Sequence, residues 1–302
     1  MTRVFLWAAA LALLAISVGG CGELPASASV RGVRVVAAEN FWGSIARQLG
    51  GRRATVTSII SSPAQDPHAY EPTAADARTL AEARLAVVNG VGYDPWASRL
   101  LAANPADART VLNVGTLLRL HPGDNPHRWY DPADVERVAG SLAAAFGRLD
   151  PGHADYYAQR LRAWQTGSLA RYHALIAAIR RRYAGVAIGA SESIFALQAP
   201  ALGLRLLTPR GFMRAVTEGT EVTAADTAAT ERQITARGVR VWIVNRQNLT
   251  PEVQRLDGFA RAAGIPIVTV TETLSPAGAS FEQWQTRQLA ALASALHRVT
   301  GR

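Results

Sequence analysis

Two of the six histidines in this 302-residue chain occur in the same local setting. His68 ends the tripeptide Asp-Pro-His, and His127 ends the tripeptide Asn-Pro-His. Asp or Asn before proline favours a turn, and proline fixes its own φ, so each imidazole should leave its loop in a set direction. A single histidine is most often a structural hydrogen-bonding group. Two rigidly held imidazoles in separate loops are instead suited to binding a divalent metal ion.

Two glutamates, Glu192 and Glu272, follow strand-like segments farther along the chain. Alone, Glu192 would be interpreted as an acid in the first turn of a helix, and Glu272 as a solvated loop residue. Their placement mirrors that of the two histidines, which also follow strand-like segments. Two neutral imidazoles and two carboxylates cancel the charge of a divalent cation, and N and O ligands suit Zn²⁺, Mn²⁺ or Fe²⁺.

Short apolar segments alternate with amphipathic helical segments over most of the chain. This alternation predicts an α/β protein with two lobes, each a mainly parallel sheet flanked by helices. The predicted strands are 33–37, 54–60, 85–89, 111–114, 185–189, 240–244 and 267–270. The predicted helices are 40–49 with Asn40 as N-cap, 74–83, 93–103, 132–149, one starting at Ser193, 224–236, 251–263 and 282–299. Ligands bind such sheets at the carboxyl ends of the strands, where all four candidate residues lie.

A different element is predicted over residues 155–183, where aromatic and aliphatic residues recur at helical spacing without proline. One continuous helix of this length would extend roughly 42 Å, enough to run along two lobes. The alternative is a surface helix within a single domain. We therefore expect lobes at 33–150 and 184–302, each contributing metal ligands, joined by a backbone helix at 151–183.

The first 20 residues are typical of a bacterial export signal, with Arg3 before an uncharged apolar segment that is too short to span a membrane. Small residues then precede Cys21, which is the only cysteine and therefore cannot form an intramolecular disulfide. This pattern resembles a lipobox. It predicts cleavage before Cys21, lipidation of that residue, and a linker over 21–32 that tethers the protein to the outer face of a membrane. The alternative is ordinary secretion.

The net charge is +9, and every basic residue that contributes to it is an arginine, because the chain contains no lysine. The charges are dispersed apart from the arginine triplet at 180–182. The sequence lacks the basic stripe interleaved with aromatic residues that is typical of nucleic-acid binders. We therefore expect no nucleic-acid partner. A modest attraction to anionic lipid would suit a tethered protein.

Several motifs resemble a known family, the metal-binding solute-binding lipoproteins of ABC importers, of the zinc and manganese type with a TroA-like fold. The matching stretches are AENFW at 38–42, QDPH at 65–68, NGVGYDPW at 89–96 and NPHRWYDP at 125–132, with looser matches at 191–195 and 270–273. The resemblance implies two lobes held by a rigid helix, with a metal ion between them. It also implies a monomeric, extracytoplasmic protein that delivers Zn²⁺ or Mn²⁺, with Fe²⁺ as a further candidate, to an ABC permease.

The resemblance also implies the ligand set. His68 and His127 match the two family histidines, Glu192 matches a position of His or Glu, and Glu272 matches a position that usually holds Asp. The His-rich loop of zinc-dedicated members is missing, and only His121 lies in that stretch. These two departures leave the identity of the metal open.

Three other functions remain as alternatives. A metal-dependent hydrolase is disfavoured, since the chain lacks HExxH, GxSxG and phosphate-loop motifs and four protein ligands would leave no open coordination position. A siderophore- or cobalamin-type binding protein also has two lobes and a long helix, but it needs no converging histidines. An adhesin role could coexist with transport. We expect no enzymatic activity.

Overall fold

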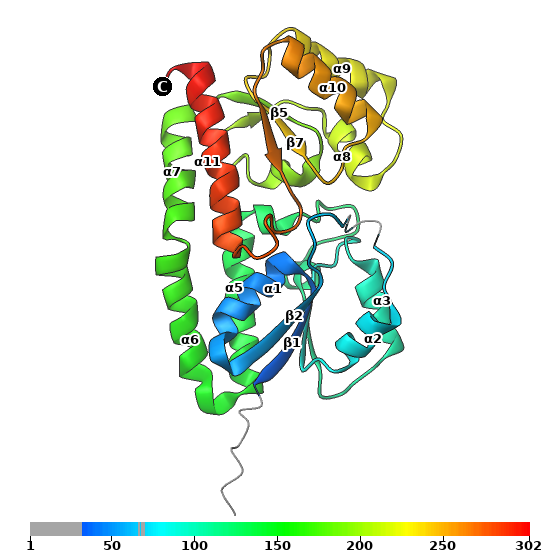
Figure 1. Ribbon diagram of the computed structural model, residues 1–302, viewed down its shortest axis with the longest axis vertical. Coiled ribbons are helices and arrows are strands. Elements are labelled where there is room, and N and C mark those ends of the chain that lie inside the picture. Colours follow the sequence, from blue (N-terminus) through cyan, green and yellow to red (C-terminus); the bar gives the residue numbers. More distant parts are fainter. Residues whose placement is uncertain (1–31, 66, 68–69) are drawn as a thin grey trace, which may run out of the picture. The chain divides into compact units, whose positions relative to one another are not determined.

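Two four-stranded parallel sheets organise the chain, as predicted for an α/β protein with two lobes (Figure 1). The computed structural model describes residues 32–65, 67 and 70–302. The first sheet has the order β2-β1-β3-β4, with β1 (Val33–Glu39), β2 (Ala54–Ile60), β3 (Leu85–Val88) and β4 (Thr110–Asn113). The second has the order β6-β5-β7-β8, with β5 (Ala187–Ala190), β6 (Arg205–Leu206), β7 (Trp242–Asn245) and β8 (Ile267–Val270).

Local sequence signals mark the starts of several helices around the sheets. Asp131 caps α5 by accepting from the backbone N of Ala133, and Thr73 and Ser280 form capping boxes at the starts of α2 and α11. In the first lobe these elements are α1 (Asn40–Gly50), η1 (Gly51–Arg53), α2 (Ala74–Ala81), α3 (Pro95–Ala103), α4 (Val114–Leu117), η2 (Arg128–Tyr130) and α5 (Pro132–Leu149). In the second lobe they are η5 (Ser193–Leu197), α8 (Arg210–Glu218), α9 (Ala224–Thr235), α10 (Pro251–Ala262) and α11 (Phe281–Thr300).

The connection between the sheets is helical but is not the uninterrupted α-helix that the sequence predicts. It consists of η3 (Pro151–His153), α6 (Ala154–Ala163), a π-helical turn η4 (Trp164–Ser168) and α7 (Ala170–Tyr183). In the π-helical turn the backbone N of Leu169 donates to the carbonyl of Trp164 at 2.9 Å. Gly167, the one breaker in the segment, lies within this turn, where its low helix propensity weakens the regular pattern. The α7 helix lies side by side with α11 (Figure 1).

One hydrophobic core extends from the first sheet through the connecting helices to the second. Phe41 stacks on Trp129 with a centroid separation of 3.9 Å, and Tyr130 meets Trp284 of α11 edge-on at 5.8 Å. Trp96 is also buried. The two sheets therefore belong to one compact unit, Gly32–Arg302, and side chains from both can contribute to one site.

Some local predictions are wrong in detail. Asn40 is the first helical residue of α1 rather than its N-cap, because its side chain accepts from the backbone N of Leu274 and donates to the carbonyl of Ser61. The helix expected from Ser193 is the short 3₁₀ element η5, and Pro200 disfavours helical geometry just beyond it. The elements α4, β6 and α8 were not predicted. The α4 and β6 elements have only four and two residues, too few to show a period. In α8, by contrast, the buried residues Phe212, Met213 and Val216 recur at helical spacing, so the sequence carried a signal for this helix.

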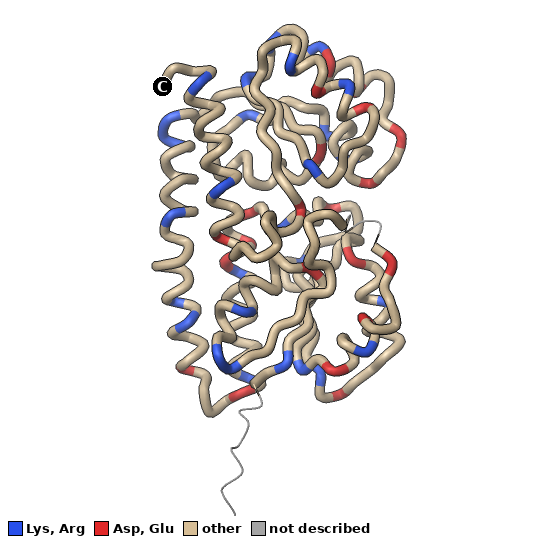
Figure 2. Tube along the Cα trace, viewed as in Figure 1, with Lys and Arg blue, Asp and Glu red and all other residues tan. Residues whose placement is uncertain are grey.

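Several predictions fall outside the described residues, namely the signal segment 1–20, Cys21 with its linker, and His68. The boundaries proposed for the lobes likewise stay predictions. Among the described residues, no helix is both long and apolar enough to cross a membrane. Figure 2 shows basic positions distributed over both lobes and along the connecting helices rather than in one stripe.

Candidate metal site

Three of the four candidate ligands converge between the two sheets. His127, Glu192 and Glu272 each offer one ligand atom, and these atoms lie within 4.8 Å of one another. All three side chains are fully buried. The first sheet supplies His127 through the segment that follows β4, and the second supplies both glutamates from just beyond β5 and β8. The carboxyl ends of parallel strands thus meet at one place, as expected for a ligand site in such sheets.

The ring of His127 is held in one orientation by the residue that begins the Asn-Pro-His turn. Asn125 Oδ1 accepts from the backbone N of His127 at 3.0 Å and lies 2.9 Å from its Nδ1. The Asn125 amide is oriented in turn, because its Nδ2 donates to the carbonyl of Ser193 at 2.7 Å. Nδ1 therefore carries the proton, and Nε2 carries the lone pair that a metal ion would use.

The two glutamates receive hydrogen bonds from neutral side chains. Asn245 Nδ2 donates to Oε1 of Glu192 and to Oε1 of Glu272, both at 2.7 Å. Asn248 Nδ2 donates to the other oxygen of Glu192 at 2.8 Å. Neutral donors stabilise the ionised carboxylates without cancelling their charge, so the charge remains available to a cation.

A tyrosine of the first lobe, Tyr93, forms a hydrogen bond with Glu272 of the second lobe. The hydroxyl of Tyr93 donates to Oε2 of Glu272 at 2.7 Å. Burial, and after it the neighbouring carboxyl groups of Glu272 and Glu39, raise the pKa of Tyr93 well above its ordinary value. The phenol therefore stays protonated at neutral pH and acts as a donor.

A second pair of buried carboxyls lies beside the site in the first lobe. Glu39 ends β1 and is fully buried, and its pKa is raised by burial and by the neighbouring Asp94. Burial also raises the pKa of Asp94 to about 6, although its two oxygens accept from the backbone N of Asn89 and of Gly90, each at 2.7 Å. Glu39 is therefore the member of the pair that keeps its proton most readily.

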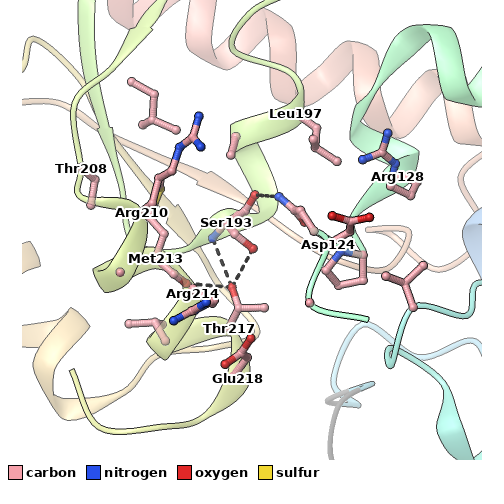
Figure 3. A pocket seen from close by; sticks show the side chains of 18 of the residues that line it. Asp124, Arg128, Ser193, Leu197, Thr208, Arg210, Met213, Arg214, Thr217 and Glu218 are labelled. Atoms are coloured by element: carbon pink, nitrogen blue, oxygen red, sulfur yellow. Dashed lines mark hydrogen bonds between the residues drawn. The ribbon is translucent and has the colours of Figure 1, made fainter. Parts of the chain in front are cut away.

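A cavity of about 1450 Å³ opens beside the site, between the loop that precedes His127 and the η5–α8 region of the second lobe (Figure 3). Ser193 lies in its wall, where its Oγ contacts Thr217 Oγ1 at 2.9 Å and His127 Nδ1 at 3.3 Å. The cavity thus reaches the groups that hold His127 but not the buried ligand atoms. An ion passing from this cavity to the ligands would require local movement of the cavity wall.

Sequence reasoning found three residues of this cluster and missed the groups that hold them. His68 lies outside the described residues, so its prediction is not tested. Among the histidines outside this cluster, the side chain of His121 is 86% exposed, and those of His153 and His173 are 40% and 39% exposed. The missed residues are Glu39, Tyr93, Asn245, Gln247 and Asn248, whereas Asn125 was expected to form the turn that directs His127. The sequence carried a signal for Asn245, because it is a polar residue at the end of a strand and the two glutamates likewise follow strand ends.

Comparison with known proteins relates the chain to metal-binding proteins. It is 27% identical over 158 residues to the manganese-binding lipoprotein MntA of Halalkalibacterium halodurans, a match that covers 50% of this chain and 52% of that protein. The chain thus spans about half the length of the curated relatives it matches.

Solved structures share the fold over a larger part of the chain. The periplasmic zinc-binding protein TroA from Treponema pallidum has a TM-score of 0.72 at 19% identity and covers 88% of this chain and 99% of its own. The Mn-bound S38A mutant of the periplasmic metal-binding protein from Candidatus Liberibacter asiaticus has a TM-score of 0.74 at 16% identity, covering 87% and 99%. These neighbours show the same two-lobed α/β fold.

The family model extends over nearly the whole described chain. It matches residues 35–295, which include both sheets, the connecting helices and all three converging side chains. The resemblance noted in the sequence is therefore confirmed, and the chain belongs to the family described as ZnuA, zinc-uptake complex component A, periplasmic.

Proposed function

We propose that this protein captures a divalent transition metal ion, Zn²⁺ or Mn²⁺, between its lobes outside the cytoplasm and delivers it to an ABC permease. The observation that carries the proposal is the convergence of His127, Glu192 and Glu272 from two sheets at a fully buried point. Family membership supports the role of a solute-binding protein rather than an enzyme. The relatives' names include manganese and zinc binding, which supports the two metals.

We propose His68 as the fourth ligand, from the Asp-Pro-His turn of the first lobe. Two histidines and two glutamates would neutralise a divalent cation and surround it with N and O donors. A site closed by four protein ligands suits capture and release of an ion more than catalysis, since catalysis needs an open coordination position.

Calorimetry on the chelator-stripped chain tests this function. We expect about one ion bound per monomer, with tight binding abolished in His127→Ala, because a rigidly aimed imidazole has no substitute nearby. His121→Ala is the matched control, since His121 is 86% exposed, and it should bind as the wild type does. Absence of binding for Zn²⁺, Mn²⁺ and Fe²⁺ alike would overturn the proposal.

We further propose that the mature protein is a monomer tethered by a lipid on Cys21. The supporting observation is the export signal that ends in small residues before the only cysteine. Detergent partitioning of the wild type and of Cys21→Ser, expressed in a host that lipidates exported proteins, tests the tether. We expect only the wild type to enter the detergent phase, and partitioning of both into water would refute lipidation.

A further inference from the structure

In space, the side chain of Asn245 lies between the two glutamates of the second lobe. It ends β7, which lies between β5 and β8 in the sheet, and the two glutamates follow those flanking strands. Because neighbouring parallel strands end side by side, the last residue of the middle strand must lie between the residues that follow the outer two. The Asn245 side chain is fully buried there.

The orientation of the Asn245 amide is determined by its neighbours. Its Oδ1 accepts from the backbone N of Gln247 at 3.0 Å, so its Nδ2 must face the carboxylates. The two Nδ2 hydrogens serve the two glutamates, one each, at 2.7 Å. The backbone N of Asn245 donates to Ser191 Oγ at 3.1 Å, which ties the residue to the segment just before Glu192.

Two further amide side chains, Gln247 and Asn248 in the loop just after β7, hydrogen-bond these glutamates or the backbone around them. Gln247 Oε1 accepts from the backbone N of Glu272 at 2.8 Å and from that of Thr273 at 3.0 Å. Its Nε2 donates to the carbonyl of Gln65 in the first lobe at 2.9 Å. Asn248 Nδ2 binds both Glu192 and the carbonyl of Val216. We call Asn245, Gln247 and Asn248 the amide loop.

We propose that the amide loop positions the two acidic ligands and determines which metal the site prefers, with Asn245 as its principal positioning residue. This inference rests on the proposed metal-capture function. A carboxylate offers about four acceptor sites, so the hydrogen bonds from Asn245, Asn248 and Tyr93 still permit coordination of an ion. A donor on Oε1 of each glutamate disfavours two-oxygen coordination by that glutamate. The amide loop therefore favours few, well-aimed ligand atoms, as tetrahedral Zn²⁺ requires, over the larger oxygen set that suits Mn²⁺.

The test compares wild type, Asn245→Leu and Asn245→Ser in competition titrations with Zn²⁺ and Mn²⁺. Leu keeps the approximate volume without a donor, and Ser retains at most one donor and cannot serve both glutamates. We expect Zn²⁺ affinity to fall about 10–100-fold in both variants, as is typical when a group that orients metal ligands is lost. We expect a smaller fall for Mn²⁺, so the Zn²⁺/Mn²⁺ affinity ratio should decrease. Asn104→Ser, at the end of α3, is the control and should change neither affinity.

Co²⁺ absorption provides a readout that a purely structural role for Asn245 would not change. Four-coordinate Co²⁺ absorbs visible light much more strongly than six-coordinate Co²⁺. We expect the Co²⁺-loaded variants to absorb more weakly than Co²⁺-loaded wild type. If the Leu variant does not fold, the Ser variant alone decides the question.

The outcomes separate this inference from the function on which it rests. If wild type binds no metal ion, the proposed function fails. If wild type binds and the folded variants keep its affinity ratio and its Co²⁺ spectrum, the amide loop has no positioning role. An equal loss of affinity for both ions with an unchanged spectrum would also overturn the assignment.

Discussion

Replacing Tyr93 by phenylalanine removes the hydroxyl that hydrogen-bonds Glu272 of the other lobe and keeps the aromatic ring. The hydroxyl of Tyr93 donates to Glu272 Oε2 at 2.7 Å, and both side chains are buried. The ring itself packs against Phe41 and Trp129, with centroid separations of 6.2 and 4.8 Å. Phenylalanine preserves these ring contacts, so the substitution measures the loss of the hydrogen bond without adding a large cavity.

The size of the effect follows from the charge of the acceptor. A hydrogen bond to a charged group contributes about 1.5–3 kcal/mol, and we expect the free energy of unfolding of the metal-free protein to fall by about that amount. About 1.4 kcal/mol corresponds to a tenfold change in affinity. The largest value for this bond, about 3 kcal/mol, therefore limits the loss of metal affinity to roughly 140-fold. We expect metal affinity to fall about 10–100-fold, because Glu272 loses a group that orients it.

Urea unfolding of the metal-free protein and competition titration of Zn²⁺ measure the two effects separately. Tyr157→Phe is the matched control. Tyr157 is also fully buried, and its hydroxyl donates to a carboxylate, Asp150 Oδ2, at 2.8 Å in the connecting segment. We expect the control to lose stability, toward the lower end of the range because the Asp150 side chain is 26% exposed, and to retain wild-type metal affinity.

Two results would refute this reasoning. Unchanged or tighter metal binding in Tyr93→Phe would mean that the hydroxyl does not orient Glu272 for an ion. Equal losses of metal affinity in Tyr93→Phe and Tyr157→Phe would mean that affinity follows general stability rather than the contact at the site.

Glu192→His should raise the Zn²⁺/Mn²⁺ affinity ratio by about tenfold or more in competition titrations, because a borderline nitrogen replaces a hard oxygen and one negative charge is lost. Glu39→Gln should become more stable relative to wild type as pH rises above 4.5. The pKa of Glu39 in the folded protein is raised above that ordinary value, so Glu39 ionises more readily in the unfolded chain and wild type loses stability. Urea unfolding from about pH 4 to about pH 8 measures this difference. Gly189→Ala should destabilise the protein by about 1–3 kcal/mol in urea, since its Cβ would lie 2.7 Å from the buried ring of Trp242.

Each of these predictions has an outcome that contradicts it. An unchanged Zn²⁺/Mn²⁺ ratio in Glu192→His would place Glu192 outside the coordination sphere. A stability difference between Glu39→Gln and wild type that does not vary with pH would mean that Glu39 titrates normally. Gly258→Ala serves as the control for Gly189→Ala, since a Cβ at Gly258 meets no atom within 4 Å and alanine favours a helix. Equal stability of the two alanine variants would contradict the packing argument.

Local sequence was sufficient to predict most elements, because caps, apolar periodicity and turn residues act over a few positions. The predicted strand 267–270 matches β8, and the predicted helix 132–149 matches α5. The turn geometry at His127 also follows from its neighbours, since Asn125, two residues away, holds the backbone and ring of the histidine. Where local signals were mixed, as at Gly167 in the connecting helix, the prediction missed the π-helical turn.

The sequence also predicted three residues of the buried cluster, since imidazoles and carboxylates that follow strand ends can be recognised without knowing how the strands are ordered. What it could not provide was the set of contacts between distant segments. Tyr93 and Glu272 are 179 positions apart, and their hydrogen bond depends on how the two lobes pack. The place of Asn245 between two glutamates depends likewise on β7 lying between β5 and β8. Strand order and lobe packing arise from burial of the whole apolar core, which no short stretch of sequence encodes.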